Sequence, residues 1–356
     1  MGRWWALGRL GHALLAAWGI TSVIFLLLQG LAPIPDSLAL GDPSDVSSGL
    51  RLGTQANRQA ALQALRHRLG LDEPLFYITR TAGSPPSWHW HGVHNQYHQW
   101  FSHLLRGDLG VSYRTGQPVA QLLGPALAYT IPLMVLALAV ASTLAVWLAL
   151  GLANAPARGG SWRASVRALL AGMQVLPLFT VALALLLLLA NPDVLNVLPA
   201  DGMRNYPPLG TFAWLLSYGA HAVLPLLSLV LTALPELTLT LEAALRQELV
   251  AGYATTARAK GLTSWQLLRR HALPNALLPL VTTFTSLLPG LVSGAVVVEV
   301  LFAMPGTGRL LATAAASHDY PVVLAGVLLT ATARLLALLV ADILYFWADP
   351  RLRPAS

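Results

Sequence analysis

Six runs of apolar residues constrain the fold of this chain more than any other feature of its sequence. They occupy approximately residues 13–28, 131–152, 169–190, 223–241, 277–300 and 322–347. At about 1.5 Å per residue, a helical run of this kind can cross the roughly 30 Å of a bilayer's hydrocarbon core. Helices and closed barrels alone satisfy their backbone hydrogen bonds there. The pattern predicts an all-α polytopic membrane protein with about six transmembrane helices.

The composition agrees with that class and excludes others. Of the 356 residues, 55% are hydrophobic and 10% are charged, whereas soluble domains carry about 25% charged residues. The net charge of +7 does not indicate a nucleic-acid partner, because arginines collect beside membrane spans for topological reasons. Cysteine is absent, so the chain has no disulfide framework or thiolate site. Lys260 is the only lysine and lies between Ala259 and Gly261, which excludes a phosphate-binding P-loop and nucleotide hydrolysis by that route.

The apolar runs also predict the domain organisation. Residues 1–28 are predicted to be a signal-anchor span, in which Arg3 and Arg9 precede the apolar run. A cleaved secretory signal is the alternative, but the later spans favour a retained anchor. Residues 29–129 are too polar to span and form a small extracytoplasmic subdomain between the first two spans. Residues 130–348 are the core transmembrane domain, and 349–356 are a cytoplasmic tail. Prolines in or beside the spans predict kinks, and they are Pro132, Pro177, Pro225, Pro235 and Pro289.

The stretch 83–100, GSPPSWHWHGVHNQYHQW, is rich in histidine and aromatic residues. Imidazoles are common metal ligands, and the stretch offers four of them: His89, His91, His94 and His98. No carboxylate or thiolate lies among them, and Pro85 and Pro86 indicate an irregular loop. Because tryptophan and tyrosine favour the membrane–water interface, we interpret the stretch as interfacial rather than as a metal site.

Arginine in the short connections sets the orientation. With both termini in the cytoplasm, the inner segments carry most of the basic residues, as the positive-inside rule requires. The polar stretch 242–275 then also faces the cytoplasm. Within it we expect a helix to about Lys260, a left-handed turn at Gly261, and a capping box of Thr263 and Gln266. A short amphipathic helix would follow over 264–272 and end at Pro274. By physics alone it is either a lipid-facing basic loop or a knob that docks into a partner.

Two segments of this stretch carry a family resemblance. YATTARAKGL at 253–262 and HALPNALLP at 271–279 resemble the coupling loop of ABC-transporter permeases, in the first-permease type of the dipeptide/oligopeptide/nickel importer class. In the class pattern, an EAA triplet precedes a glycine, then a hydrophobic position and Leu-Pro. That glycine falls at Gly261, which places Thr255, Thr256 and Ala257 at the EAA positions, and His271 and Leu273-Pro274 at the later ones. The literal Glu-Ala-Ala at 242–244 does not fit, since Glu248 follows Glu242 at the glycine spacing.

Further segments resemble the same class in the same order along nearly the whole chain: LGLDEPL (69–75), RGDLGVSYRTGQPV (106–119), EVLFAMPGTGRLL (299–311), SHDYPVVLAGVLL (317–329) and DPRLRP (349–354). Two features depart from the class. PIPD stands at 33–36 in place of the usual Pro-Gly-Asp-Pro, with GDP at 41–43, and the histidine-aromatic insert is long. Both lie in the predicted extracytoplasmic subdomain, so they bear on substrate and binding-protein specificity.

The resemblance implies a transport subunit of the bacterial inner membrane, with neither catalytic nor metal-ligating residues. Its partners would be a second related permease, two cytoplasmic ABC ATPases that use the ATP, and an extracytoplasmic solute-binding protein. This chain would bind no cofactor itself. The substrate would be di- or oligopeptides, with nickel or another metal chelate as the alternative. The implied ATPase-coupling residues are Thr255, Thr256, Ala257, Arg258, Lys260, Gly261, Thr263, Ser264, Trp265, Arg269, Arg270, His271, Leu273 and Pro274.

Two other function classes are alternatives to a permease subunit. An ion-coupled secondary transporter would use ionisable groups within spans, and the candidates are Glu236, Glu299, Arg334 and Asp342. Membrane-embedded enzymes are disfavoured because the H-E-x-x-H and G-x-S-x-G motifs are both absent.

Overall fold

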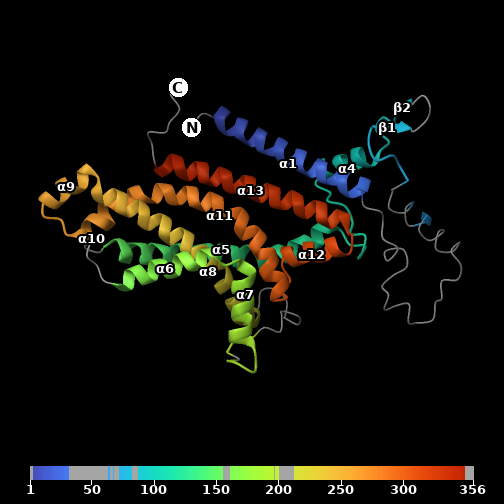
Figure 1. Cartoon of the computed structure of the whole chain (residues 1–356). Helices are drawn as coiled ribbons and strands as arrows, with labels where there is room; N and C mark the ends of the chain where they lie inside the picture. The colour runs from blue at the N-terminus through green and yellow to red at the C-terminus, as the bar shows by residue number, and fades with distance from the viewer. Residues whose placement is uncertain are drawn as a thin grey trace. The chain divides into compact units, whose positions relative to one another are not determined.

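The computed structural model describes residues 3–31, 63–64, 67, 72–81, 87–154, 161–195, 197–199 and 212–348. The N-terminal elements (Figure 1) are α1 (Arg3–Leu31), β1 (Ile78–Thr81), β2 (Ser87–Trp90) and α4 (Gln96–Leu105). Next come α5 (Val119–Ala153), α6 (Ser161–Val175), α7 (Leu178–Leu185), the π-helix η2 (Leu186–Ala190) and α8 (Phe212–Val250). The last are α9 (Gly252–Ala259), α10 (Ser264–Leu267), the π-helix η3 (Leu268–Ala272), α11 (Leu273–Leu301), α12 (Thr307–Ala316) and α13 (Tyr320–Ala348).

The chain divides into two compact units. The core unit comprises Ala126–Arg309 and Ala333–Ser356, and the N-terminal unit comprises Gly2–Pro125 and Leu310–Thr332. The predicted cytoplasmic tail at 349–356 and the unusual PIPD segment at 33–36 lie outside the described residues. The predicted division at 29, 130 and 349 therefore stays a prediction.

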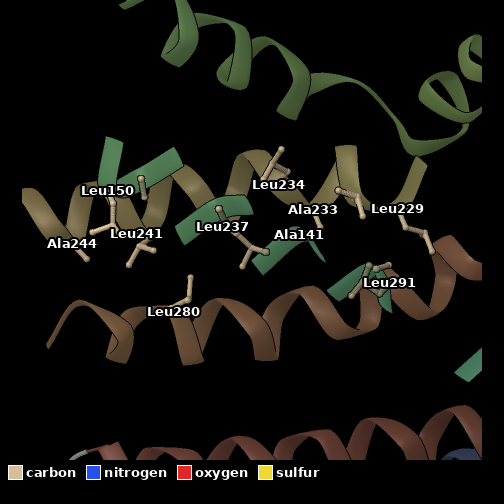
Figure 2. Packing of buried hydrophobic residues seen from close by; sticks show 14 of the residues in the cluster. Ala141, Leu150, Leu229, Ala233, Leu234, Leu237, Leu241, Ala244, Leu280 and Leu291 are labelled. Atoms are coloured by element: carbon tan, nitrogen blue, oxygen red, sulfur yellow. The ribbon is translucent and has the colours of Figure 1, made fainter. Parts of the chain in front are cut away.

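The core unit is built on α8, which packs against α11, α6 and α7. Its buried leucines and alanines interdigitate with those of α5 and α11, as Figure 2 shows. On α5 a stripe of small residues, one every four positions, is fully buried: Ala137, Ala141, Ala145 and Ala149. Small residues at this spacing let helix backbones approach closely, which is how membrane helices gain packing contacts.

Two described helices are long and apolar enough to cross a membrane, α5 and residues 219–250 of α8. The number rises to four if each of two bent pairs counts as one span. These are α6 with α7–η2, bent by 105°, and the two halves of α11, bent by 44°. Shorter apolar helices occupy Leu14–Gly30 and Tyr320–Leu336, within the first and last predicted spans. The helical membrane architecture is therefore confirmed, whereas the count of six spans stays a prediction.

The proline kinks follow the prediction in part. The 105° bend lies at Pro177, which caps α7, and the 44° bend lies near Pro289. In contrast, α8 continues through Pro225 and Pro235, and α5 continues through Pro132. A proline removes one helical hydrogen bond, and in α8 the buried Leu224 and Leu234 beside the prolines supply packing that holds the helix together.

In the N-terminal unit the histidine-aromatic stretch is more regular than predicted. Strands β1 and β2 pair antiparallel, with Ile78 opposite Trp90 and Thr81 opposite Ser87. Helix α4 then begins at the Asn95 cap, whose side chain accepts a hydrogen bond from the His98 amide at 2.8 Å. The prediction of an irregular loop was therefore wrong on both sides of residues 91–95. The cause is alternation in SWHW and a good capping residue, two local signals that outweigh the preceding prolines.

Aromatic packing joins α4 to α1 within this unit. The Phe25 ring stacks on Trp100 with centroids 4.8 Å apart and meets Tyr97 edge-on. The Tyr97 hydroxyl also lies 2.9 Å from the Ser22 hydroxyl. Such pairs add about 0.5–1.5 kcal/mol beyond their buried area, so they fix α4 against the end of α1.

Candidate functional site

The polar residues between α8 and α11 form a compact helical turn, here named the 251–274 segment. Helix α8 ends at Val250, α9 covers Gly252–Ala259, and α10 with η3 covers Ser264–Ala272 (Figure 1). Residues 242–250, which the sequence analysis grouped with the loop, belong to α8. In this part of α8, Leu245 and the preceding Leu241 are fully buried.

The turn between α9 and α10 has the predicted geometry. Gly261 has φ +86°, a left-handed conformation that glycine adopts without steric cost. Its amide donates to the Arg258 carbonyl at 2.9 Å, and the Leu262 amide donates to the Ala257 carbonyl at 3.2 Å. The capping box of Thr263 and Gln266 is also confirmed, with the two reciprocal hydrogen bonds at 3.1 and 3.3 Å.

Helix α10 does not end at Pro274 as predicted. The chain passes from η3 directly into α11, and Pro274 lies in the first turn of that helix. The short helix and the following span are thus one continuous helical path.

Apolar side chains anchor the segment in the core unit. Leu267 and Leu268 are completely buried, as is Ala254, and Ala272 is 1% exposed. Leu268 and Ala272 belong to the same buried cluster as Leu241 of α8 and Ala276 of α11. Burial of each leucine contributes about 1.5–3 kcal/mol, so these side chains hold α10 and η3 in the packing of the core unit.

Hydrogen bonds tie the two ends of the segment to α8. The Glu248 carboxylate accepts from the Tyr253 hydroxyl at 2.6 Å and from the Asn275 amide group at 3.2 Å. The Arg258 guanidinium donates to the Leu249 carbonyl at 2.9 Å. Desolvation, and after it the hydrogen bond to Glu248, raises the pKa of Tyr253 above its usual 10.0. The phenol therefore stays protonated and able to donate at physiological pH.

The opposite side of the segment is exposed and basic. Of the fourteen predicted coupling residues, twelve are exposed, while Ala257 and Leu273 are half-buried. Arg258, Lys260, Arg269 and Arg270 contribute four cations, and the 251–274 segment contains no acidic residue. The Arg269 guanidinium lies 5.7 Å from the centre of the Trp265 ring, within cation–π range. The class pattern has a hydrophobic residue at His271, but this imidazole is exposed.

Glu242 has a role that the sequence did not reveal. Its side chain is 5% exposed, and one carboxylate oxygen accepts from both Arg167 of α6 and Arg246 of α8, each at 2.8 Å. Glu242 therefore joins α6 to α8 and takes no part in the exposed surface. The spacing of four residues to Arg246 was a readable signal, whereas Arg167 lies 75 positions away.

The ionisable residues in the apolar runs do not form a relay in the described part of the chain. Glu299 is fully buried and accepts from the Thr130 hydroxyl at 2.6 Å and from the amides of Gly308 and Arg309 at 2.7 and 3.2 Å. It thereby caps the start of α12. Glu236 is half-buried and Arg334 is exposed; the side chain of Asp342 lies outside the described ones. Among the described residues no group of three or more His, Asp or Glu could hold a metal ion.

These features define a helical membrane protein that presents a basic surface anchored in the packing of two long apolar helices. The chain belongs to the family described as binding-protein-dependent transport system inner membrane component, whose model matches residues 141–354.

Several curated proteins are similar over nearly their full lengths. The probable D,D-dipeptide transport system permease protein DdpB of Escherichia coli (strain K12) is 30% identical, with 94% of this chain and 95% of the relative covered. The di/tripeptide transport system permease protein DppB of Pseudomonas aeruginosa (strain UCBPP-PA14) is 31% identical, with 97% of each chain covered. The oligopeptide transport system permease protein AppB of Bacillus subtilis (strain 168) is 28% identical, with 94% of each covered.

Proposed function

We propose that this chain is a permease subunit of an ATP-driven importer of di- and oligopeptides, and that ATP energy enters it through the 251–274 segment. The observation that carries the proposal is the two-sidedness of that segment. Its outer side offers cations and hydroxyls, while Leu267, Leu268 and Ala272 on its inner side are buried among the helices of the core unit. The family and the names of the relatives support peptides as the substrate.

The partners would be a second, related permease, two cytoplasmic ABC ATPases and an extracytoplasmic solute-binding protein. An acidic or polar groove on an ATPase would receive α10 and η3, because the exposed side carries Arg269 and Arg270 and the 251–274 segment contains no acidic residue. The chain itself would bind no cofactor. We further propose six spans in the bacterial inner membrane, both termini in the cytoplasm, and an extracytoplasmic subdomain over 29–129.

The coupling would be mechanical. Closure of the ATPase pair would push α10, and the push would pass through Leu268 and Ala272 to Leu241 of α8 and Ala276 of α11. Well-packed interiors transmit displacement because they are dense and poorly compressible. The two helices would then tilt and switch the pathway from inward- to outward-facing. Gly261 would supply the turn that presents α10, and Thr263 would fix the start of that helix.

The lipid-facing alternative is less well supported. A basic loop on anionic lipid needs cations near the bilayer surface, but it does not need two fully buried leucines or the reciprocal capping of a four-residue helix. Proton-coupled transport is also less well supported, because three donors already engage the buried Glu299 carboxylate.

Reconstitution tests the function directly. The chain, its second permease and both ATPases are placed in liposomes, and ATP hydrolysis is measured with binding protein loaded with a dipeptide or with a nickel chelate. We expect stimulation by the dipeptide-loaded protein. Stimulation by the nickel chelate alone would assign the substrate to the other branch of the class. Transport that survives ATP depletion but collapses with an uncoupler would reject the importer.

A substitution at Gly261 tests the coupling step. Nothing lies within 4 Å of a Cβ built there, but φ +86° strains any residue with a side chain. Gly261→Val should therefore misdirect α10 and uncouple transport from ATP hydrolysis, while the protein still reaches the membrane. Gly252→Val is the matched control, since Gly252 is exposed, has equal space and lacks the positive φ. Normal coupled transport by Gly261→Val would overturn the assigned role of the turn.

A further inference from the structure

A cavity of about 770 Å³ lies within the N-terminal unit, and no residue of the 251–274 segment lines it. It opens between the last turns of α1, helix α4, the loop 108–116 and the first turn of α13. Its volume falls in the range of about 300–1,000 Å³ that is usual for small-molecule sites. The apolar residues of its lining are Phe25, Trp100, Leu109, Val111, Pro321 and Leu324.

The walls of the cavity are held in place by contacts within the same unit. Asp319, which is 3% exposed, accepts hydrogen bonds from the Ser112 hydroxyl and, at 2.9 Å, from the Tyr113 amide. The loop closes on itself through the Ser112 amide and the Gln117 carbonyl at 2.9 Å. Gly110, at φ +84°, supplies the bend before it. A pre-formed site binds without a large ordering cost.

The polar lining offers opposite charges and amide groups. Asp108 provides a carboxylate, Arg114 a guanidinium, and three glutamines provide amides: Gln29, Gln96 and Gln99. His103 Nδ1 lies 3.2 Å from Asp108 Oδ2. Burial raises the pKa of Tyr113 above 10.0, so this phenol lines the cavity as a neutral hydrogen-bonding group.

These groups select a class of ligand. A metal ion would find one carboxylate and one imidazole, too few for a site. A phosphate-rich ligand would meet a single guanidinium and a repelling carboxylate. A ligand with a free ammonium, a free carboxylate, an amide and an apolar side chain would match the carboxylate, the guanidinium, the amides and the apolar residues of the lining. We propose that the cavity binds short peptides with free termini, with Asp108 at the ammonium and Arg114 at the carboxylate; this rests on the proposed function.

The test uses the full chain in lipid nanodiscs without binding protein or ATPases, and measures binding of Ala-Leu by calorimetry. Arg114→Gln should weaken binding of the free peptide about tenfold and leave binding of its C-terminal amide at the wild-type level. Asp108→Asn should weaken the free peptide similarly and leave N-acetyl-Ala-Leu unchanged. The Arg106→Gln variant changes an exposed arginine at the end of α4 that does not line the cavity, and it should bind all three peptides like the wild type.

Three results would overturn the proposal. They are no binding of Ala-Leu by the wild-type chain, equal losses for free and blocked peptides, and a co-purified phospholipid that fills the cavity and resists displacement by Ala-Leu. If any of these occurs while peptide-loaded binding protein still stimulates ATP hydrolysis, the cavity assignment fails and the importer function stands. If that stimulation is missing as well, the peptide substrate itself is rejected.

Discussion

The 251–274 segment and the corner between α11 and α12 both carry motifs of the peptide-permease class. The polar groups of the segment are exposed, whereas those of the corner are buried. In the segment, cations and hydroxyls are exposed, and apolar residues hold the backbone. At the corner, Glu299 is completely buried and holds Thr130 and the first amides of α12. A methyl group at Gly306 or Gly308 would overlap Glu299 or Val296. The first motif is thus available to a partner, whereas the second is used internally.

This difference separates the consequences of mutation. Removing an internal polar group leaves its partners buried and unsatisfied, which costs free energy of unfolding. Removing an exposed polar group costs little stability, but it changes what another protein can bind. Stability and partner binding, measured on the same variants, therefore distinguish the two regions.

The largest loss of stability is expected at the corner. Glu299→Ala removes the acceptor for one hydroxyl and two amides and leaves a cavity, so we expect the free energy of unfolding to fall by about 3–5 kcal/mol. Denaturant titration in detergent measures this, and the half-buried Glu236→Ala is the control. A wild-type midpoint for Glu299→Ala would show that the corner is held by something other than this carboxylate.

The anchor of the 251–274 segment should come next. Leu268→Ala truncates a fully buried side chain, and such substitutions cost about 2–5 kcal/mol. Because Leu268 also links η3 to the core cluster, ATP hydrolysis per peptide transported should rise in the reconstituted importer. Leu262→Ala, at a half-buried position in the turn, should change both quantities less. Unchanged stability and coupling in Leu268→Ala would contradict the anchoring role.

A small effect is expected at the ion pair on α8. Arg246→Gln breaks a half-exposed contact, and Arg167 still pairs with Glu242; the expected change in unfolding free energy is about 0–1 kcal/mol. Glu242→Ala, in contrast, leaves two arginines without their shared partner. If Arg246→Gln were as costly as Glu242→Ala, the pair between Arg167 and Glu242 would contribute no measurable stability.

Local signals in the sequence predicted local structure. The turn at Gly261 and the capping box of Thr263 and Gln266 were predictable because each depends on residues within three or four positions. Contacts between distant positions were not predictable in this way. Arg167 reaches Glu242 across 75 positions, and Ser112 reaches Asp319 across 207.

The predicted effects of two groups of prolines also differ from the structure. Prolines were expected to kink α8, but the buried side chains around Pro225 and Pro235 keep it continuous. Pro85 and Pro86 were expected to leave an irregular stretch, but the alternation of SWHW forms β2 just after them. In α8 contacts with other parts of the chain outweighed the intrinsic preference of proline, whereas in β2 a local pattern did so.

The exposed cations of the 251–274 segment are central to the proposed docking of the ATPases, and the double variant Arg269→Glu/Arg270→Glu tests them. Its unfolding free energy should stay within about 0.5 kcal/mol of the wild type, since both side chains are exposed. The decisive measurement is the affinity of the purified ATPase subunits for the permease pair in nanodiscs, with Arg106→Glu, a charge reversal outside the 251–274 segment, as the control. We predict at least a tenfold loss for the double variant and none for the control. Wild-type affinity in the stable double variant would contradict the proposed docking of the ATPases on these cations.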